Sequence, residues 1–153
     1  KQMKGYILPS SPIIDGKLIS KKPSKVLKND EQHQIPYMLG STSEDMMPPI
    51  IYKMSHDYCK AQEIPSYCWM FNQQLPGDNN GAWHSSDLWY WFGSLENCWR
   101  PITNNDIELS NKMVKYLTNF AKNGNPNAGD LPLWESNIKT NSLGTNILES
   151  LSI

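Results

Sequence analysis

The sequence predicts an α/β fold in which short buried strands alternate with helices. Two continuous apolar runs, residues 35–40 and 67–71, have the composition of strands that are buried on both faces. Between them, residues 48–62 carry apolar side chains at four-residue spacing, which is typical of a helix with one buried face. A strand, a helix and a second strand in this order favour a mostly parallel sheet flanked by helices, with residues 35–39 as a central strand.

Local signals set the limits of the other elements. Prolines at positions 9, 12 and 23 interrupt residues 1–34, where we expect residues 13–16 to be extended and to end in a turn, and residues 24–29 to form a short helix. Pro48 and Pro49 are typical of a first helical turn, because the N–H that proline lacks has no partner there. Residues 131–134 are expected to form a loop, and residues 146–151 a final strand.

The clearest helix covers residues 106–122. Thr103 and Asp106 resemble a capping box at its start, and Gly124 with Pro126 marks its end. Side chains at helical spacing predict one buried face, made of Ser110, Met113, Val114, Leu117, Phe120 and Ala121. We expect this helix to be structural.

Composition excludes several classes of function. Fourteen basic and fifteen acidic residues give a formal net charge of −1, which favours neither nucleic acid nor an acidic membrane surface as a partner. No apolar run approaches the roughly 20 residues that cross a bilayer. Cys59, Cys68 and Cys98 are widely spaced and form no C-x-x-C pair, so we expect no metal, no cofactor and a reducing, cytoplasmic compartment.

Candidate catalytic groups follow the two predicted strands. Glu44 and Asp45 come directly after the first strand, and His84 follows the second in a loop rich in Gly and Asn. The carboxyl ends of parallel strands meet at one edge of a sheet, where ligands and chemistry gather. Histidine can take and return a proton near neutral pH. The plainer alternatives are that one carboxylate caps the following helix and that the histidine is a surface residue.

Four segments in this order resemble the C-terminal part of type-B carboxylesterases, the cholinesterase- and lipase-related α/β-hydrolases. They are residues 12–16 (PIIDG), 39–45 (LGSTSED), 81–93 (GAWHSSDLWYWFG) and 119–134, which contains FAKNGNPN and ends in LPLW. The resemblance implies an α/β-hydrolase fold and a Ser–acid–His triad in that chain order. It assigns the catalytic histidine to His84 and the acid to Asp45, with Glu44 as the alternative acid.

The sequence also departs from the family pattern. Asp stands where the acid is usually Glu, Met46 stands where Gly is usual, and only 39 residues separate Asp45 from His84. No G-x-S-x-G motif and no His-Gly-Gly stretch occurs. We therefore interpret residues 1–153 as the C-terminal fragment of one hydrolase domain, inactive without the part that carries the nucleophile.

The expected substrate is a small-molecule ester, with Trp83 a candidate to line its acyl or alcohol pocket. Most of the aromatic run 89–92 is expected to pack in the core. The N-terminal part of the same enzyme, or a second copy of the chain, should cover the exposed sheet edge. Two rival functions remain: a non-catalytic binding or adhesion module, and carbohydrate binding by exposed, coplanar rings of Trp89 or Trp91.

Overall fold

The computed structural model describes residues 13–137, 140–144 and 150–151. The chain divides into two compact units, residues 1–33 and 34–153. In the first unit, Asp15 Oδ1 accepts the backbone N–H groups of Lys17, Leu18 and Ile19 and so forms the expected turn. The short helix α1 (Pro23–Lys28) follows, as predicted.

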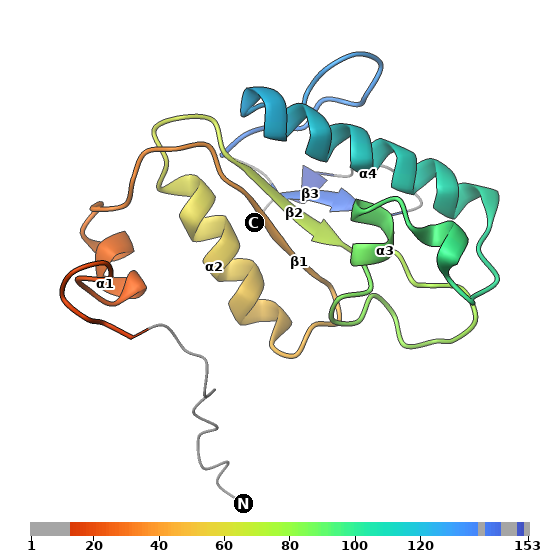
Figure 1. Cartoon of the computed structure of the whole chain (residues 1–153), viewed down its shortest axis with the longest axis horizontal. Coiled ribbons are helices and arrows are strands. Elements are labelled where there is room, and N and C mark those ends of the chain that lie inside the picture. Colours follow the sequence, from red (N-terminus) through yellow and green to blue (C-terminus); the bar gives the residue numbers. More distant parts are fainter. Residues whose placement is uncertain (1–12, 138–139, 145–149, 152–153) are drawn as a thin grey trace, which may run out of the picture. The chain divides into compact units, whose positions relative to one another are not determined.

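The second unit is built on a four-stranded sheet in the order β1-β2-β3-β4 (Figure 1). Strand β1 (Met38–Thr42) pairs parallel with β2 (Tyr67–Phe71), and β2 pairs parallel with β3 (Thr140–Leu143). The two-residue strand β4 (Ser150–Leu151) is antiparallel to β3. Helix α2 (Pro48–Lys60) connects β1 to β2, so the predicted strand–helix–strand unit and its parallel pairing are confirmed.

The first strand differs from its prediction in its limits. It begins at Met38, after Pro36, and it continues to Thr42, beyond the apolar run 35–40 that predicted it. Among the described residues β1 has β2 on one side and no strand on the other side. Its central position stays a prediction, because it requires a neighbouring strand from outside the described residues.

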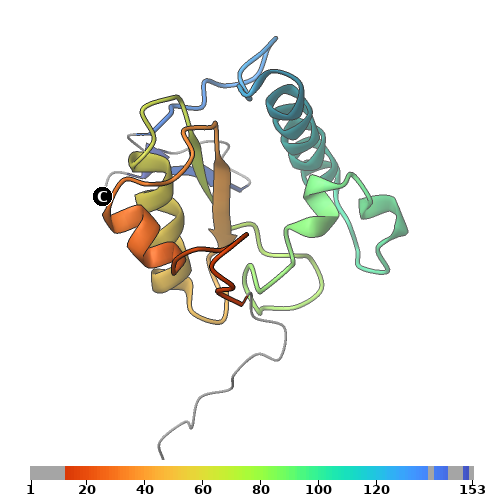
Figure 2. The same cartoon turned by 60° about the vertical axis from the view of Figure 1, so that its left-hand side comes forward.

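Helices cover both faces of the sheet (Figure 2). Helix α2 packs against β1 and β2 on one face, and its Cys59 is buried. The opposite face carries the main core, to which α3 (Leu88–Trp91) and the long helix α4 (Asn104–Asn123) contribute. The fully buried large side chains of this core include Phe71, Leu75, Tyr90, Met113, Tyr116 and Trp134.

Helix α4 confirms its predicted cap and most of its predicted face. The side chain and backbone of Thr103 exchange hydrogen bonds with Asp106, which completes the capping box, and Gly124 ends the helix with a φ of 67°. The predicted buried face is wrong at Ala121, which is exposed. Ala121 lies eight residues beyond the fully buried Met113, and at 100° per residue this turns it about 80° from the middle of the buried stripe, at its margin.

The end of the chain was predicted only in part. Residues 145–149, which include most of the predicted strand 146–151, lie outside the described residues, and β3 was not predicted at all. In the described part of the chain, no helix is long and apolar enough to cross a membrane.

Candidate active site

Backbone hydrogen bonds join the turn after β1, which carries Glu44 and Asp45, to the loop after β2, which carries His84 and is called the histidine loop below. Just beyond the paired ends of β1 and β2, the N–H of Ser43 donates to the carbonyl of Phe71. The N–H of Glu44 then donates to the carbonyl of Ala82 over 3.0 Å, and Glu44 forms a parallel bridge with Trp83. The two loops thus continue the parallel pairing of the strands that precede them, and this brings residue 45 beside residue 84.

His84 and Asp45 form a side-chain pair. The Nδ1 atom of His84 lies 2.9 Å from Oδ1 of Asp45. The Asp45 side chain is only 8% exposed, whereas the His84 side chain is 59% exposed. The structure therefore holds the carboxylate inside and leaves much of the imidazole open to solvent or to a second group.

Asp45 is bound by three groups. Its Oδ1 also accepts the N–H of Met46 over 2.7 Å, and its Oδ2 accepts the hydroxyl of Thr42 over 3.3 Å. Burial raises the pKa of Asp45, but the bonds from Met46, His84 and Thr42 outweigh burial and hold that pKa below its usual value. Asp45 is thus ionised at neutral pH and only accepts hydrogen bonds, so Nδ1 of His84 carries the proton in this pair.

Glu44 does not take the same place. Its side chain is exposed and lies over Gly81, where an added Cβ would be 2.6 Å from Cγ of Glu44. Gly81 has a φ of +68°, which glycine adopts without strain. Of the two acidic candidates, Asp45 is the one that the fold brings to His84, while the backbone of Glu44 joins the two loops.

The residue after the histidine has unusual backbone geometry. Ser85 has a φ of +69°, a left-handed conformation that is costly for a side chain other than Gly, Asn or Asp. Such strain persists where the surrounding structure enforces it, often at functional sites. Here the residue after Ser85, Ser86, is fully buried, and two residues before Ser85 the backbone of Trp83 is bridged to Glu44. Trp83 itself is half-buried.

Asp87 is a second buried carboxyl close to the pair. Burial raises its pKa, and the negative charge of Asp45 adds to this effect, while Trp91 and His84 oppose it. Asp87 belongs to the segment 81–93 that resembles the esterase family, and the sequence predicted no catalytic role for it. Its burial follows from the turn into α3, which no local pattern predicted.

The aromatic run divides between the core and the surface. Tyr90 and Trp91 are buried, Trp89 is half-buried, and Phe92 is 72% exposed. Trp91 meets Trp69 of β2 edge to face, with ring centres 5.2 Å apart. Carbohydrate binding by an exposed Trp91 ring is thereby contradicted. The described residues contain no group of three His, Cys, Asp or Glu side chains that could hold a metal ion.

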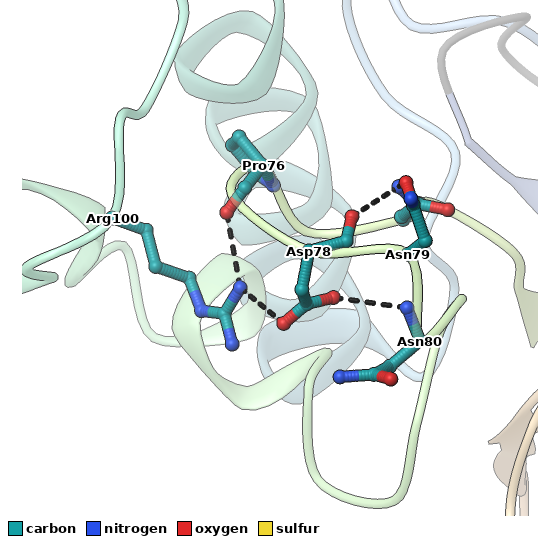
Figure 3. Close-up of polar contacts among 6 residues, drawn as sticks. Pro76, Asp78, Asn79, Asn80 and Arg100 are labelled. Atoms are coloured by element: carbon teal, nitrogen blue, oxygen red, sulfur yellow. Dashed lines mark hydrogen bonds and ion pairs between the residues drawn. The ribbon is translucent and has the colours of Figure 1, made fainter.

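Sequence reasoning missed three groups around the pair. Thr42 and the Met46 amide bind the acid, and Arg100 contacts the start of the histidine loop (Figure 3). Arg100 is the only arginine in the sequence, and this was a signal that we could have used.

Comparison with known proteins gives a consistent result. The sequence pattern of the carboxylesterase family matches residues 49–151. Carboxylesterase 4A of Bos taurus is 37% identical over 76 residues, which cover 46% of this chain and 14% of that protein. Cocaine esterase of Homo sapiens is 30% identical over 111 residues, which cover 65% of this chain and 20% of that protein. The chain thus spans a fifth or less of the length of these two relatives.

Solved structures show the same fold. A PNB esterase structure superposes with a TM-score of 0.74 and 19% identity, covering 92% of this chain and 41% of its own. An esterase from Clostridium hathewayi that hydrolyses aliphatic aromatic polyesters superposes with a TM-score of 0.57 and 20% identity, covering 66% of this chain and 22% of its own. The predicted α/β-hydrolase fold is confirmed, as a part of that fold.

Proposed function

The chain belongs to the carboxylesterase family, and we propose that it supplies the acid and the histidine of a Ser–acid–His triad that hydrolyses carboxylic esters. The observation that carries this proposal is the 2.9 Å contact between Nδ1 of His84 and Asp45. A triad needs an acid that accepts the proton on Nδ1, because this fixes the tautomer that leaves Nε2 free to act as a base.

Each group then has a distinct task. His84 Nε2 takes the proton of a serine hydroxyl as the serine oxygen attacks the ester carbonyl, and it returns that proton to the departing alcohol. Asp45 stabilises the imidazolium that exists between these two steps. A water molecule, activated by the same Nε2, then cleaves the acyl-enzyme to release the acid and the serine.

The serine must come from outside this chain. The sequence contains no G-x-S-x-G motif, and β1 has a free edge among the described residues. Apolar hollows lie on both sides of β1: Tyr37, Leu39 and Met54 line one, and Met38, Trp69 and Phe120 line the other. We propose that the nucleophile-bearing part of the enzyme covers this edge. Below, "the complete enzyme" means a protein that contains both this chain and the proposed nucleophile-bearing part.

Two finer assignments are also part of the proposal. Trp83 lines the acyl or alcohol pocket, which its half-buried position beside His84 supports. No disulfide joins Cys59, Cys68 or Cys98 in the structure, which supports a reducing, cytoplasmic compartment. A hydrogen-bonded acid–histidine pair favours the enzyme over a non-catalytic binding module, for which such a pair has no use.

The test compares three variants of the complete enzyme with a short-chain aryl ester. His84→Ala should lower kcat by several orders of magnitude, since only oxyanion and binding contributions remain. Asp45→Asn should lower kcat by roughly 10³–10⁴-fold, whereas Glu44→Gln should lower it far less. Activity of His84→Ala within tenfold of the wild type would rule out the proposed function, and the reverse order of the two acid variants would move the acid to Glu44.

A further inference from the structure

We propose that Arg100 is a positioning residue for His84, which it controls by holding residues 76–80, the stem of the histidine loop. This inference rests on the proposed function, because it gives His84 a role that depends on accurate placement. Arg100 lies sixteen residues after His84 along the chain and has no part in the triad itself.

Arg100 binds the stem at two points (Figure 3). Its Nη1 atom donates to the carbonyl oxygen of Pro76 over 3.0 Å and lies 2.6 Å from Oδ2 of Asp78. The Arg100 side chain is only 10% exposed, and that of Asp78 is 22% exposed. The Nη1 atom of Arg100 therefore fixes the distance between the carbonyl oxygen of Pro76 and the carboxylate of Asp78. Both side chains of the ion pair are largely buried, and such a charged hydrogen bond is stronger there than on an open surface.

Asp78 also accepts hydrogen bonds from two other residues at the stem, Asn80 and Gln74. Its Oδ1 accepts the N–H of Asn80 over 3.0 Å, and its own carbonyl accepts the side-chain amide of Gln74 over 2.6 Å. The Asn80 amide and Arg100 lower the pKa of Asp78, so the carboxylate is charged at neutral pH. The stem is thus held at Pro76 and Asp78 by groups from outside it, and Asp78 in turn holds Asn80.

Pro101, the residue after Arg100, also lies close to the stem. Gly77 has a φ of +100°, and an added Cβ there would be 3.2 Å from Cδ of Pro101. Arg100 stacks over the Trp99 ring, with its Cζ 4.8 Å from the ring centre. Two residues after Pro101, Thr103 begins the capping box of α4. Arg100 therefore lies shortly before α4, the longest helix in the described part of the chain, and its position depends on the start of that helix.

A short series of contacts connects the stem to the catalytic pair. Gly81 follows Asn80 and lies against Glu44, and the carbonyl of Ala82 accepts the Glu44 N–H. His84 follows two residues later and meets Asp45. Releasing the stem would give Gly81 and Ala82 freedom to leave Glu44. A displacement of about 1 Å in a catalytic group can cost about 100-fold in rate.

The test uses the complete enzyme and two readouts. Arg100→Gln should lower kcat by about 10–100-fold while changing KM by about twofold or less, because the base is misplaced and the ester pocket is not. The hydrogen-bonded Nδ1 proton of His84, followed as a low-field proton NMR signal, should weaken or exchange faster. Arg100→Lys keeps the charge and should restore part of both. Lys53→Gln, which removes an exposed ion pair with Asp57 on α2, is the matched control and should change neither readout.

The outcomes separate the two proposals. Wild-type kcat and an unchanged low-field signal in Arg100→Gln would overturn the positioning role, even if its melting temperature fell, because the ion pair would then be merely structural. If Arg100→Gln does not fold, Asp78→Asn tests the same contact with a side chain of the same shape, under the same criteria. His84→Ala, measured in the same series, reports on the proposed function alone. If that variant stays active, the function is wrong, and the NMR signal still shows whether Arg100 positions His84.

Discussion

Replacing Gly81 by alanine tests the geometry that joins the two catalytic loops. Gly81 has a φ of +68°, and a Cβ there would be 2.6 Å from Cγ of Glu44. Two separate costs are expected. An alanine in the left-handed region costs about 1–2 kcal/mol, partly offset by the lower entropy of the unfolded chain. The overlap adds about 1–3 kcal/mol if Glu44 cannot move away.

The chain contains a matched control for the first cost. Gly129 has the same φ of +68°, but nothing lies within 4 Å of an added Cβ. Gly129→Ala should therefore destabilise the complete enzyme by about 1 kcal/mol, and Gly81→Ala by about 2–4 kcal/mol. Urea unfolding measures both, with the midpoints compared at an unchanged slope.

A double variant isolates the second cost. Glu44→Ala removes Cγ, so combining it with Gly81→Ala should recover most of the difference from Gly129→Ala. The Gly81→Ala variant should also lose esterase activity, because relief of the overlap pushes the backbone of Ala82 away from Glu44. Equal midpoints for Gly81→Ala and Gly129→Ala, with full activity, would refute the close contact between the two loops.

Three further outcomes are expected. Burial raises the pKa of Asp87, so the charged carboxylate destabilises the folded protein as the pH rises through that raised pKa. Asp87→Asn should therefore raise the melting temperature at neutral pH. This gain should vanish below the usual carboxyl pKa, where Asp87 is neutral in both the folded and the unfolded protein. Thr103→Ala should cost about 1 kcal/mol in urea unfolding through loss of the capping box, and more than Thr118→Ala on the exposed side of α4. The chain alone should show no esterase activity and should associate in sedimentation experiments, because the β1 edge is uncovered; a monomer that unfolds cooperatively would contradict this.

Elements with strong local signals were predicted from the sequence. Strand β2 has the predicted limits, since a five-residue run rich in aromatic side chains is too short for a buried helix and matches a buried strand. Helix α4 carries its own start signal in Thr103 and its stop signal in Gly124. The predicted limits of β1 were wrong because Gly40–Thr42, its C-terminal half, has small and polar residues. These residues are extended only through their pairing with β2. Such pairing is a tertiary effect that no local pattern contains.

The Gly40 position shows why β1 tolerates such residues. A Cβ at Gly40 would overlap both the ring and the carbonyl of Trp69, its partner in the register. Glycine there lets the Trp69 ring lie across β1. The sequence alone offered Gly40 as the end of a strand, and it is the middle of one.

For the candidate site, the sequence placed Asp45 and His84 at one edge of the sheet, and the structure brings them into contact. The prediction was possible because strand order and parallel pairing decide where loops begin. The groups that hold the pair were not predictable in the same way. Thr42 lies beyond the apolar run that predicted β1, and Ser85 has a left-handed backbone conformation that its residue type does not favour. Arg100 reaches the loop through a tertiary contact that no local sequence pattern contains.

The acid–histidine pair depends on little beyond two adjacent strands and their loops. Thr42 and Phe71 are paired in the register of β1 and β2, and the hydrogen bonds from Ser43 and Glu44 extend that pairing to Ala82. Every bond that fixes Asp45 comes from residues 42–84 of this chain. In the proposed enzyme, the nucleophile-bearing part supplies the serine, the oxyanion donors and the cover over β1, whereas the alignment of His84 with Asp45 requires only this chain. It follows that variants in that part should change the rate without changing the His84–Asp45 contact, whereas changes at Gly81 or Arg100 should act on that contact itself.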